Sequence, residues 1–170
     1  MPDYIDYHLK ILSIGLNPSK ISVERGYYFA NPRNRFWKAF NQSNLINSYV
    51  QPNKNAHQIL LNEFNIGFSD VAKRPSRMGH ELRAKDFKRD APLLREKIEL
   101  YQPKLVWFHG KVAFSKFMQY GYNIRRSWQW GYNEIDDMQS QVYVSPNPSP
   151  ANAAFSLEAL VDSYNRIELC

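Results

Sequence analysis

The sequence is poor in cysteine, because Cys170 is the only one among its 170 residues. One thiol cannot form an intrachain disulfide, and one is too few for a cysteine-ligated zinc site or iron–sulfur cluster. The four histidines, His8, His57, His80 and His109, do not show the spacing of metal ligands. We therefore expect an intracellular protein that uses no metal and no cofactor.

The sequence also lacks any apolar run near the roughly 18 to 20 residues that a membrane-spanning helix requires. Its first residues, Met-Pro-Asp-Tyr, do not show the basic-then-apolar pattern of a secretion signal. These absences predict a soluble, cytoplasmic chain with no membrane contact. Lysine and arginine total 22 against 16 acidic residues, which gives a net charge of +6. Such a surplus favours a polyanionic partner, although many proteins without one carry it.

Length and hydrophobic patterning predict one domain over residues 1–170, because a chain of this size can bury one good core. Apolar runs predict four buried strands at residues 9–16, 66–72, 105–108 and 141–145. Helical spacing predicts the connecting helices at residues 35–44, 54–62, 85–101, 111–120 and 155–169. Residues 124–135 are open to two interpretations, a hairpin or a loop turning at Gly131. Alternating strands and helices predict a three-layer α/β/α fold around a mainly parallel four-stranded sheet.

Two asparagine-proline turns follow predicted strands. Asn17 and Pro18 come after the first strand, and Asn147 and Pro148 come after the last. If the two strands are neighbours, their ends deliver two neutral amides to the crevice where open α/β sheets bind ligands. Such groups suit an uncharged planar ring and a water molecule directed towards it.

Several further blocks carry a family resemblance. The longest is residues 28–38, Tyr-Phe-Ala-Asn-Pro-Arg-Asn-Arg-Phe-Trp-Lys, and the others are residues 15–19, 67–75, 101–104 and 146–149. In their order and approximate spacing they resemble the mismatch-specific uracil-DNA glycosylases, which include thymine-DNA glycosylase. The resemblance implies a uracil-DNA glycosylase-like fold, a monomeric enzyme, and removal of damaged bases from DNA.

The resemblance implies that Asn17 and Asn147 are catalytic residues. Breaking an N-glycosidic bond builds positive charge on the sugar and negative charge on the departing base. The carboxamide of Asn17 can orient a water through its oxygen but cannot act as a strong base, so we expect a slow enzyme. Asn147 can donate to a base carbonyl as negative charge grows there. The alternative for Asn17 is a turn-forming residue bonded to its own backbone.

Asp70 is the third candidate catalytic residue, at a position where relatives commonly carry asparagine or lysine. Its carboxyl can accept from a base N–H or polarise the water, but a carboxylate beside a departing anion is repulsive unless it is protonated. The alternative is a surface residue that caps the strand end. By resemblance, Phe29 stacks on the extruded base, with core packing as its alternative. The implied base-binding set is completed by Gly15, Leu16, Pro18, Ser19, Asn31 and Ser69.

A DNA-binding segment is implied by Ser149, Pro150, Ala151 and Asn152, which resemble the loop that replaces a flipped base in the duplex. The mismatch enzymes have a bulkier wedge here, so single-stranded or weakened pairs are expected to be the better substrates. Arg74 and Arg77 are the basic residues assigned to DNA. They belong to a larger group that can face either phosphates or solvent: Arg33, Arg35, Lys38, Lys73, Arg74, Arg77, Arg83, Lys85, Lys88 and Arg89.

Together these features predict a monofunctional DNA glycosylase of base excision repair. It would flip uracil, or another damaged base, out of DNA and hydrolyse the glycosidic bond to leave an abasic site. No lysine lies in a recognisable nucleophile motif, so we expect no strand cleavage. One alternative is a non-catalytic damaged-DNA-binding protein on the same fold. A small-molecule hydrolase or nucleotide-binding protein is less favoured, because the sequence has no Gly-rich phosphate loop and no Ser/His/Asp set.

Overall fold

The computed structural model describes residues 1–169, so Cys170 lies outside the described residues. The elements follow one another as β1 (Ile11–Gly15), α1 (Lys20–Arg25), α2 (Phe36–Gln42), α3 (Ala56–Phe64), β2 (Ile66–Asp70), a 3₁₀ turn (Gly79–Glu81), α4 (Ala84–Tyr101), β3 (Leu105–His109), α5 (Lys111–Tyr122), β4 (Gly131–Asn133), β5 (Gln141–Ser145) and α6 (Leu157–Asn165).

The strands form one sheet in the order β2-β1-β3-β5-β4. The first four strands in that order are parallel, and β4 pairs antiparallel with β5. The mainly parallel α/β fold is therefore confirmed, but the sheet has five strands rather than four. The extra strand lies in the ambiguous segment 124–135. It escaped prediction because its three residues are all half-buried and show no apolar alternation.

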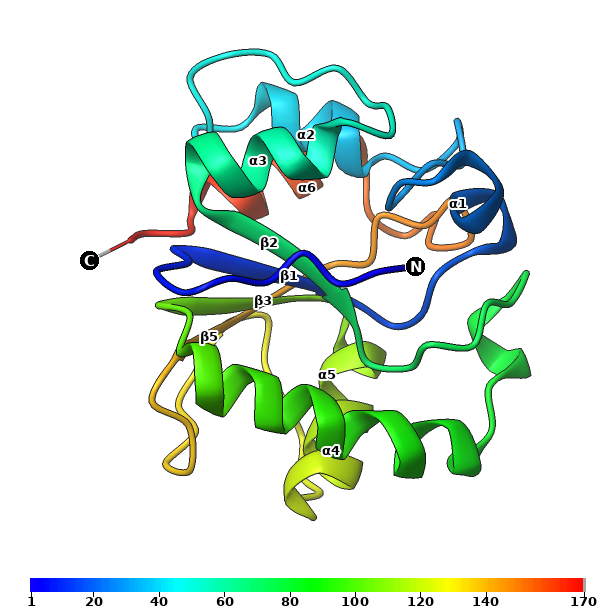
Figure 1. Cartoon of the computed structure of the whole chain (residues 1–170). Coiled ribbons are helices and arrows are strands. Elements are labelled where there is room, and N and C mark those ends of the chain that lie inside the picture. The colour runs from blue at the N-terminus through cyan, green and yellow to red at the C-terminus, as the bar shows by residue number, and fades with distance from the viewer. Residues whose placement is uncertain (170) are drawn as a thin grey trace.

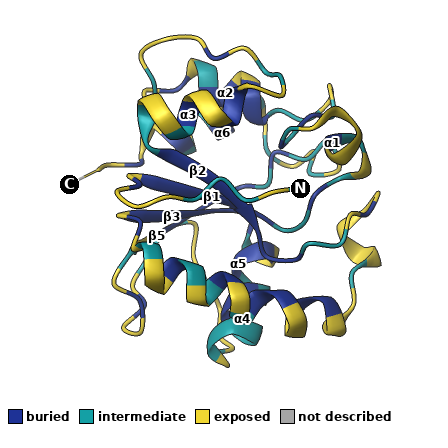
Figure 2. Cartoon of the chain, in the orientation of Figure 1, coloured by how far each residue is buried: buried dark blue, intermediate teal, exposed yellow. Residues whose placement is uncertain are grey.

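Helices cover both faces of the sheet (Figure 1). Helices α2, α3 and α6 cover one face, and α4 and α5 cover the other. The four parallel strands are buried almost throughout, whereas the outer sides of the helices are exposed (Figure 2). Each face has its own apolar cluster, built around Phe36, Trp37 and Trp107 on the first side and around Phe108 and Phe114 on the second. These clusters hold the sheet edge that carries the candidate site.

Several helix boundaries differ from the prediction. Helix α5 does not end at residue 120 but continues to Tyr122, and the left-handed Asn123 (φ 57°) ends it. The last helix covers only Leu157–Asn165, because the Ser156 hydroxyl caps its start by accepting from the Ala159 N–H. Helix α1 was not predicted. It is a short turn whose Ser19 cap accepts from the Ser22 N–H.

The two strands that precede the asparagine-proline turns are not direct neighbours, because β3 lies between β1 and β5. Their carboxyl ends still meet at one edge, since all three strands run parallel. In Figure 1 the segments after β1 and β5 come together at the same end of the molecule, beside α1. Within residues 1–169, no helix combines the length and the apolar character needed to cross a membrane.

The core under α5 provides a test of the fold. Phe114 is fully buried, and the centroid of its ring lies 4.9 Å from that of Phe108 and 4.7 Å from that of Trp128. We expect Phe114→Ala to lower the free energy of unfolding by about 3–5 kcal/mol through lost burial and the cavity left behind. Leu100→Ala, at a side chain that is 60% exposed, should change it by less than about 0.5 kcal/mol. Urea unfolding measures both, and equal effects would contradict this packing.

Candidate functional site

A row of side chains at the carboxyl ends of the strands forms the floor of the candidate site. Gly15 pairs in register with Asp70 of β2, and His109 of β3 pairs with Ser145 of β5. In-register residues of parallel strands point to the same face, here the face covered by α2, α3 and α6. Gly15 lacks a side chain, and a Cβ atom there would lie 2.8 Å from Asp70 Oδ1. The carboxyl of Asp70 therefore occupies the position above Gly15 that a side chain would take.

Gly15, Asp70 and His109 line a cavity of about 700 Å³. The turn after β1 contributes Gly15, Leu16, Asn17, Pro18 and Ser19 to its lining. The loop before α2 contributes Phe29 and Asn31, and β2 and the segment after it contribute Asp70 and Arg77. The segment after β5 contributes Asn147, Ser149, Pro150 and Ala151. Most of the residues singled out from the sequence thus meet around one cavity.

Three of those residues do not line the cavity. Ser69 precedes Asp70 on the strand, and its hydroxyl donates to Asp3 Oδ1 at 2.8 Å instead. The guanidinium of Arg74 forms two hydrogen bonds to Asp86, at 3.0 and 2.9 Å. Asn152 lies just behind the lining, where its Nδ2 donates to the carbonyl of Asn147 at 2.9 Å.

The carboxamide of Asn17 is held by its nitrogen. Nδ2 donates to the carbonyl of Arg74 at 2.9 Å and to Ser76 Oγ at 2.7 Å. The Ser76 hydroxyl in turn donates to the carbonyl of Met78 at 2.9 Å. A carbonyl oxygen can only accept, so the atom of Asn17 that faces it must be the nitrogen. The oxygen Oδ1 is left as an acceptor without a partner among the described residues, and Asn17 lines the cavity.

The carboxamide of Asn147 is held the opposite way round. Its Oδ1 accepts from the Ser149 N–H at 2.9 Å, which leaves Nδ2 as the donor that remains available. The backbone beneath it packs on Gly110, which has φ 106° and would bring an added Cβ atom to 3.2 Å from that of Asn147. A glycine is therefore required at position 110, both for its conformation and for the close approach. The two asparagines offer complementary hydrogen-bonding atoms.

Phe29 is held in an unusual backbone conformation, with φ 57°. Its ring stacks on Phe36 with centroids 4.3 Å apart, and it meets His109 edge-on at 5.1 Å. The preceding residue, Tyr28, donates its N–H to His57 Nε2 at 2.7 Å and accepts at its carbonyl from Trp37 Nε1 at 3.0 Å. Left-handed conformations of bulky residues persist only where the surroundings enforce them, and they cluster at functional sites.

Asp70 is a buried carboxyl, 3% exposed, whose Oδ2 has no hydrogen-bond partner. Burial raises the pKa of Asp70 to about 7 and the nearby Asp3 adds to the rise, although Lys73 opposes it. Among the ion pairs of residues 1–169, none includes Asp70. Near neutral pH this carboxyl therefore exchanges between its neutral and its charged form.

His109 is a lining residue to which the sequence assigned no role. It is 2% exposed, and its ring is 2.7 Å from the Ser13 hydroxyl through Nε2. Nδ1 is buried and unpartnered within residues 1–169, and burial lowers the pKa of His109 to about 3. The ring is thus neutral at physiological pH. Its position directly after the apolar run of residues 105–108 was the only sequence signal.

The segment after β5 is clamped by Arg35. The guanidinium donates to the carbonyls of Asn152, at 2.9 Å, and of Phe155, and the Arg35 N–H donates to the carbonyl of Pro148 at 3.1 Å. Arg35 belonged to the basic group assigned to DNA or solvent, but here its charge is used inside the protein. The planar guanidinium holds these carbonyls with donors in a fixed fork, a geometry that the compact ammonium of a lysine does not have.

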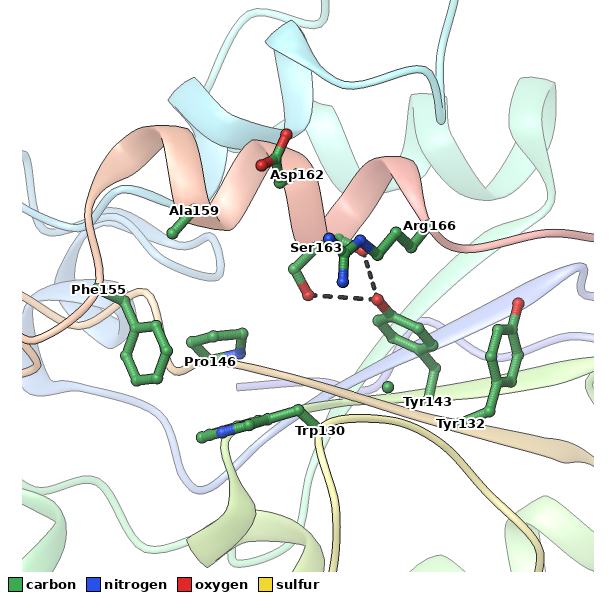
Figure 3. A pocket seen from close by; sticks show the side chains of 10 residues that line it. Trp130, Tyr132, Tyr143, Pro146, Phe155, Ala159, Asp162, Ser163 and Arg166 are labelled. Atoms are coloured by element: carbon green, nitrogen blue, oxygen red, sulfur yellow. Dashed lines mark hydrogen bonds between the residues drawn. The ribbon is translucent and has the colours of Figure 1, made fainter.

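A smaller cavity of about 360 Å³ lies on the other side of the same segment, between β4, β5 and α6 (Figure 3). Pro146 lines this cavity, whereas the next residue, Asn147, lines the larger one. Aromatic side chains line the smaller cavity. The rings of Trp130 and Phe155 meet edge-on with centroids 5.4 Å apart, and the Tyr143 hydroxyl donates to the carbonyl of Ser163 at 2.6 Å. These side chains support the strand end that carries Asn147.

Within residues 1–169, no group of three or more histidine, cysteine, aspartate or glutamate side chains is arranged to hold a metal ion. The cavity instead offers a flat ring, neutral amides and one carboxyl that titrates near pH 7. Such a lining can hold an uncharged planar group and direct a water molecule to it.

The fold and the site define an open α/β protein whose candidate ligand cavity lies at the carboxyl edge of the sheet, where such folds bind their ligands. The family model of the Uracil DNA glycosylase superfamily matches residues 2–167, and the chain belongs to that family. A solved structure with a similar fold is the solution NMR structure of a proposed uracil DNA glycosylase from Methanosarcina acetivorans. The two chains are 22% identical with a TM-score of 0.57, and the match covers 97% of this chain and 92% of the other.

The clamp of Arg35 on the segment after β5 gives a test of the site's architecture. Arg35→Lys keeps the positive charge but loses the forked donor, so we expect faster amide hydrogen exchange over residues 148–155. Arg33→Lys, a change at an exposed neighbour, should leave that exchange unaltered. Hydrogen exchange followed by mass spectrometry reports both variants. Unchanged protection in Arg35→Lys would show that the segment does not depend on these bonds.

Proposed function

We propose that this protein is a monofunctional DNA glycosylase of the mismatch-specific branch of its superfamily. It would hydrolyse the N-glycosidic bond of uracil, or of another damaged base, flipped out of DNA and leave an abasic site for base excision repair. Residues 1–170 would act as one domain, as a monomer, in the cytoplasm. The observation that carries the proposal is that Asn17 is held by its amide nitrogen and Asn147 by its amide oxygen, while both residues line one cavity.

The proposed chemistry divides between the two asparagines. Asn17 Oδ1 accepts a hydrogen bond from a water and directs the water's oxygen towards C1′ of the sugar. On uracil, Asn147 Nδ2 donates to the carbonyl next to the glycosidic nitrogen as negative charge collects there. Both groups are positioned in advance by backbone and hydroxyl partners, so little reorganisation is needed at the moment of reaction. The site lacks a strong base at Asn17, which supports a slow reaction.

Phe29 is the proposed stacking platform for the base, since one face of its ring already packs on Phe36 and the residue lines the cavity. Stacking of a base on an aromatic ring is worth roughly 1–3 kcal/mol. Gly15, Leu16, Pro18, Ser19 and Asn31 would surround the base. Ser19 is small, so thymine exclusion would be incomplete, and its hydroxyl already caps α1.

DNA would contact the rim of the cavity. Ser149, Pro150 and Ala151 would enter the space left by the flipped base, with Asn152 bracing them from behind. They are small side chains and fill a base-sized gap poorly, which favours single-stranded or weakly paired substrates. The exposed Arg77 would contact phosphate. Arg74 would act mainly through its carbonyl, which holds Asn17.

The proposal is tested by incubating the protein with uracil-containing single- and double-stranded oligonucleotides and cleaving abasic sites with alkali. We expect Asn17→Ala to slow excision at least about 100-fold, as loss of a preorganised polar group does in other enzymes. DNA affinity should be retained. Asn62→Ala, at an exposed asparagine on α3, is the matched control and should react at the wild-type rate.

The same experiment separates the enzyme from a non-catalytic damaged-DNA-binding protein. A binding protein would retain lesion-containing duplexes but release no base, and Asn17→Ala would change nothing. Failure of the wild type to release uracil or another deaminated base from single- or double-stranded oligonucleotides that carry it would refute the proposed function.

A further inference from the structure

We propose, on the basis of that function, that Asp70 takes part in the reaction as a neutral carboxylic acid. It gives its proton to the carbonyl oxygen on the edge of the base farthest from the sugar. The substrates would be bases with a carbonyl at that edge, such as O4 of uracil or the six-membered-ring carbonyl of a deaminated purine. A base with an amino group there offers no oxygen to receive the proton.

The depth of the cavity fixes which edge of the base meets Asp70. The sugar remains in the DNA strand, so the glycosidic nitrogen must stay near the mouth of the cavity. Asn17 and Asn147 are partly exposed and belong to that mouth, whereas Asp70 and His109 are 3% and 2% exposed. The edge opposite the glycosidic nitrogen would therefore reach the floor, where the carboxyl of Asp70 lies over Gly15.

The surroundings of Asp70 favour its neutral form. Oδ2 is buried with no hydrogen-bond partner, and no positively charged side chain of the described chain pairs with this carboxyl. Lys73, whose charge lowers the pKa of Asp70, pairs with Asp3, which also binds Lys97. An ionised Asp70 would thus be a buried charge with no partner, and such charges neutralise instead.

The charged and titratable groups around Asp70 come from three other parts of the chain. Asp3, in the segment before β1, raises the pKa of Asp70, whereas Lys73 and the terminal amino group of Met1 lower it. Tyr28 lies close enough that the charge of Asp70 raises the tyrosine's pKa, after the larger effect of burial. Across Gly15, His109 is neutral. Burial outweighs these contributions and leaves the pKa of Asp70 at about 7.

The bond between C1′ and the base nitrogen breaks, and its electron pair leaves with the base. The carbonyl oxygen of the base takes the proton of Asp70, so the base departs as a neutral enol and Asp70 becomes a carboxylate. The oxygen of the water held by Asn17 bonds to C1′ and releases a proton to solvent. Asp70 regains a proton from solvent, and the free enol returns to its keto form.

The pH dependence of excision tests this role. Single-turnover rates on a single-stranded uracil oligonucleotide should be constant below about pH 7 and fall about tenfold per pH unit above it, because only the protonated form donates. Asp70→Asn should be slower at low pH and should not show this fall. A wild-type rate that is flat or rises through pH 7, or an Asp70→Asn variant with the wild-type profile, would overturn the proposal.

Asp3→Asn provides a test of the surrounding charges. It removes the anion beside Asp70 and releases Lys73, so the midpoint of the pH profile should move to lower pH. The exposed Asp6→Asn is the matched control and should keep the wild-type midpoint. A shift of equal size in both variants would contradict the assignment.

Thermal unfolding reports the protonation of Asp70 without any need for activity. The folded-state pKa of about 7 lies above the ordinary value of 3.8, so the folded protein holds this proton more tightly than the unfolded chain. The contribution of Asp70 to the free energy of unfolding is fully present below about pH 4 and is lost as the pH rises to about 7. The Tm of the wild type should therefore fall relative to that of Asp70→Asn between pH 5 and pH 8.

The readouts separate failure of the inference from failure of the function. Wild-type protein that releases no base at any pH refutes the glycosylase and this role together. Base release whose rate shows no fall above pH 7 refutes only the role of Asp70. A Tm difference that stays constant between pH 5 and pH 8 likewise refutes the neutral carboxyl.

Discussion

The register of β1 with its neighbours is the constraint on which the site depends. It sets Gly15 level with Asp70, and β3 brings His109 to the same edge. One row earlier, the same face carries Phe68 and Trp107, which are buried in the core. On β2 and β3 the face therefore changes from apolar to polar within two residues. A slip of one residue would turn the polar groups to the opposite face and close the cavity.

Hydrogen bonds of fixed direction then orient the groups above this row. A backbone carbonyl holds the nitrogen of Asn17, and a backbone N–H holds the oxygen of Asn147. The peptide before Phe29 is fixed at both its N–H and its carbonyl, which offsets the cost of its left-handed backbone. Because each partner can only donate or only accept, the free atom of each amide follows without ambiguity. The cavity is thus organised before any ligand arrives.

The sequence predicted the parts of the fold that rest on continuous apolar runs and helical periodicity. It could not predict β4, whose three residues pair only because β5 has an open edge. It also assigned no role to His109, since its importance comes from the alignment of three strand ends far apart in the chain. Arg35 was a candidate DNA contact in the sequence because it is a basic residue in a loop. The structure shows that its guanidinium donates to backbone carbonyls of the protein, which the sequence could not reveal.

The distribution of charge in the cavity fits a reaction that creates opposite charges a few ångströms apart. A fixed cation on the floor would bind the departing base but oppose the positive sugar, and a fixed anion would do the reverse. The exposed Arg33 and Arg77 lie at the rim, where phosphates would pass, while the floor holds a neutral histidine and a carboxyl that can be neutral. Long-range attraction for the strand is thereby separated from the chemistry at the base, because charges at the rim are screened by solvent and those on the floor are not. A site of this kind stabilises charge only as it forms, which is the condition for accelerating the reaction rather than merely binding the substrate.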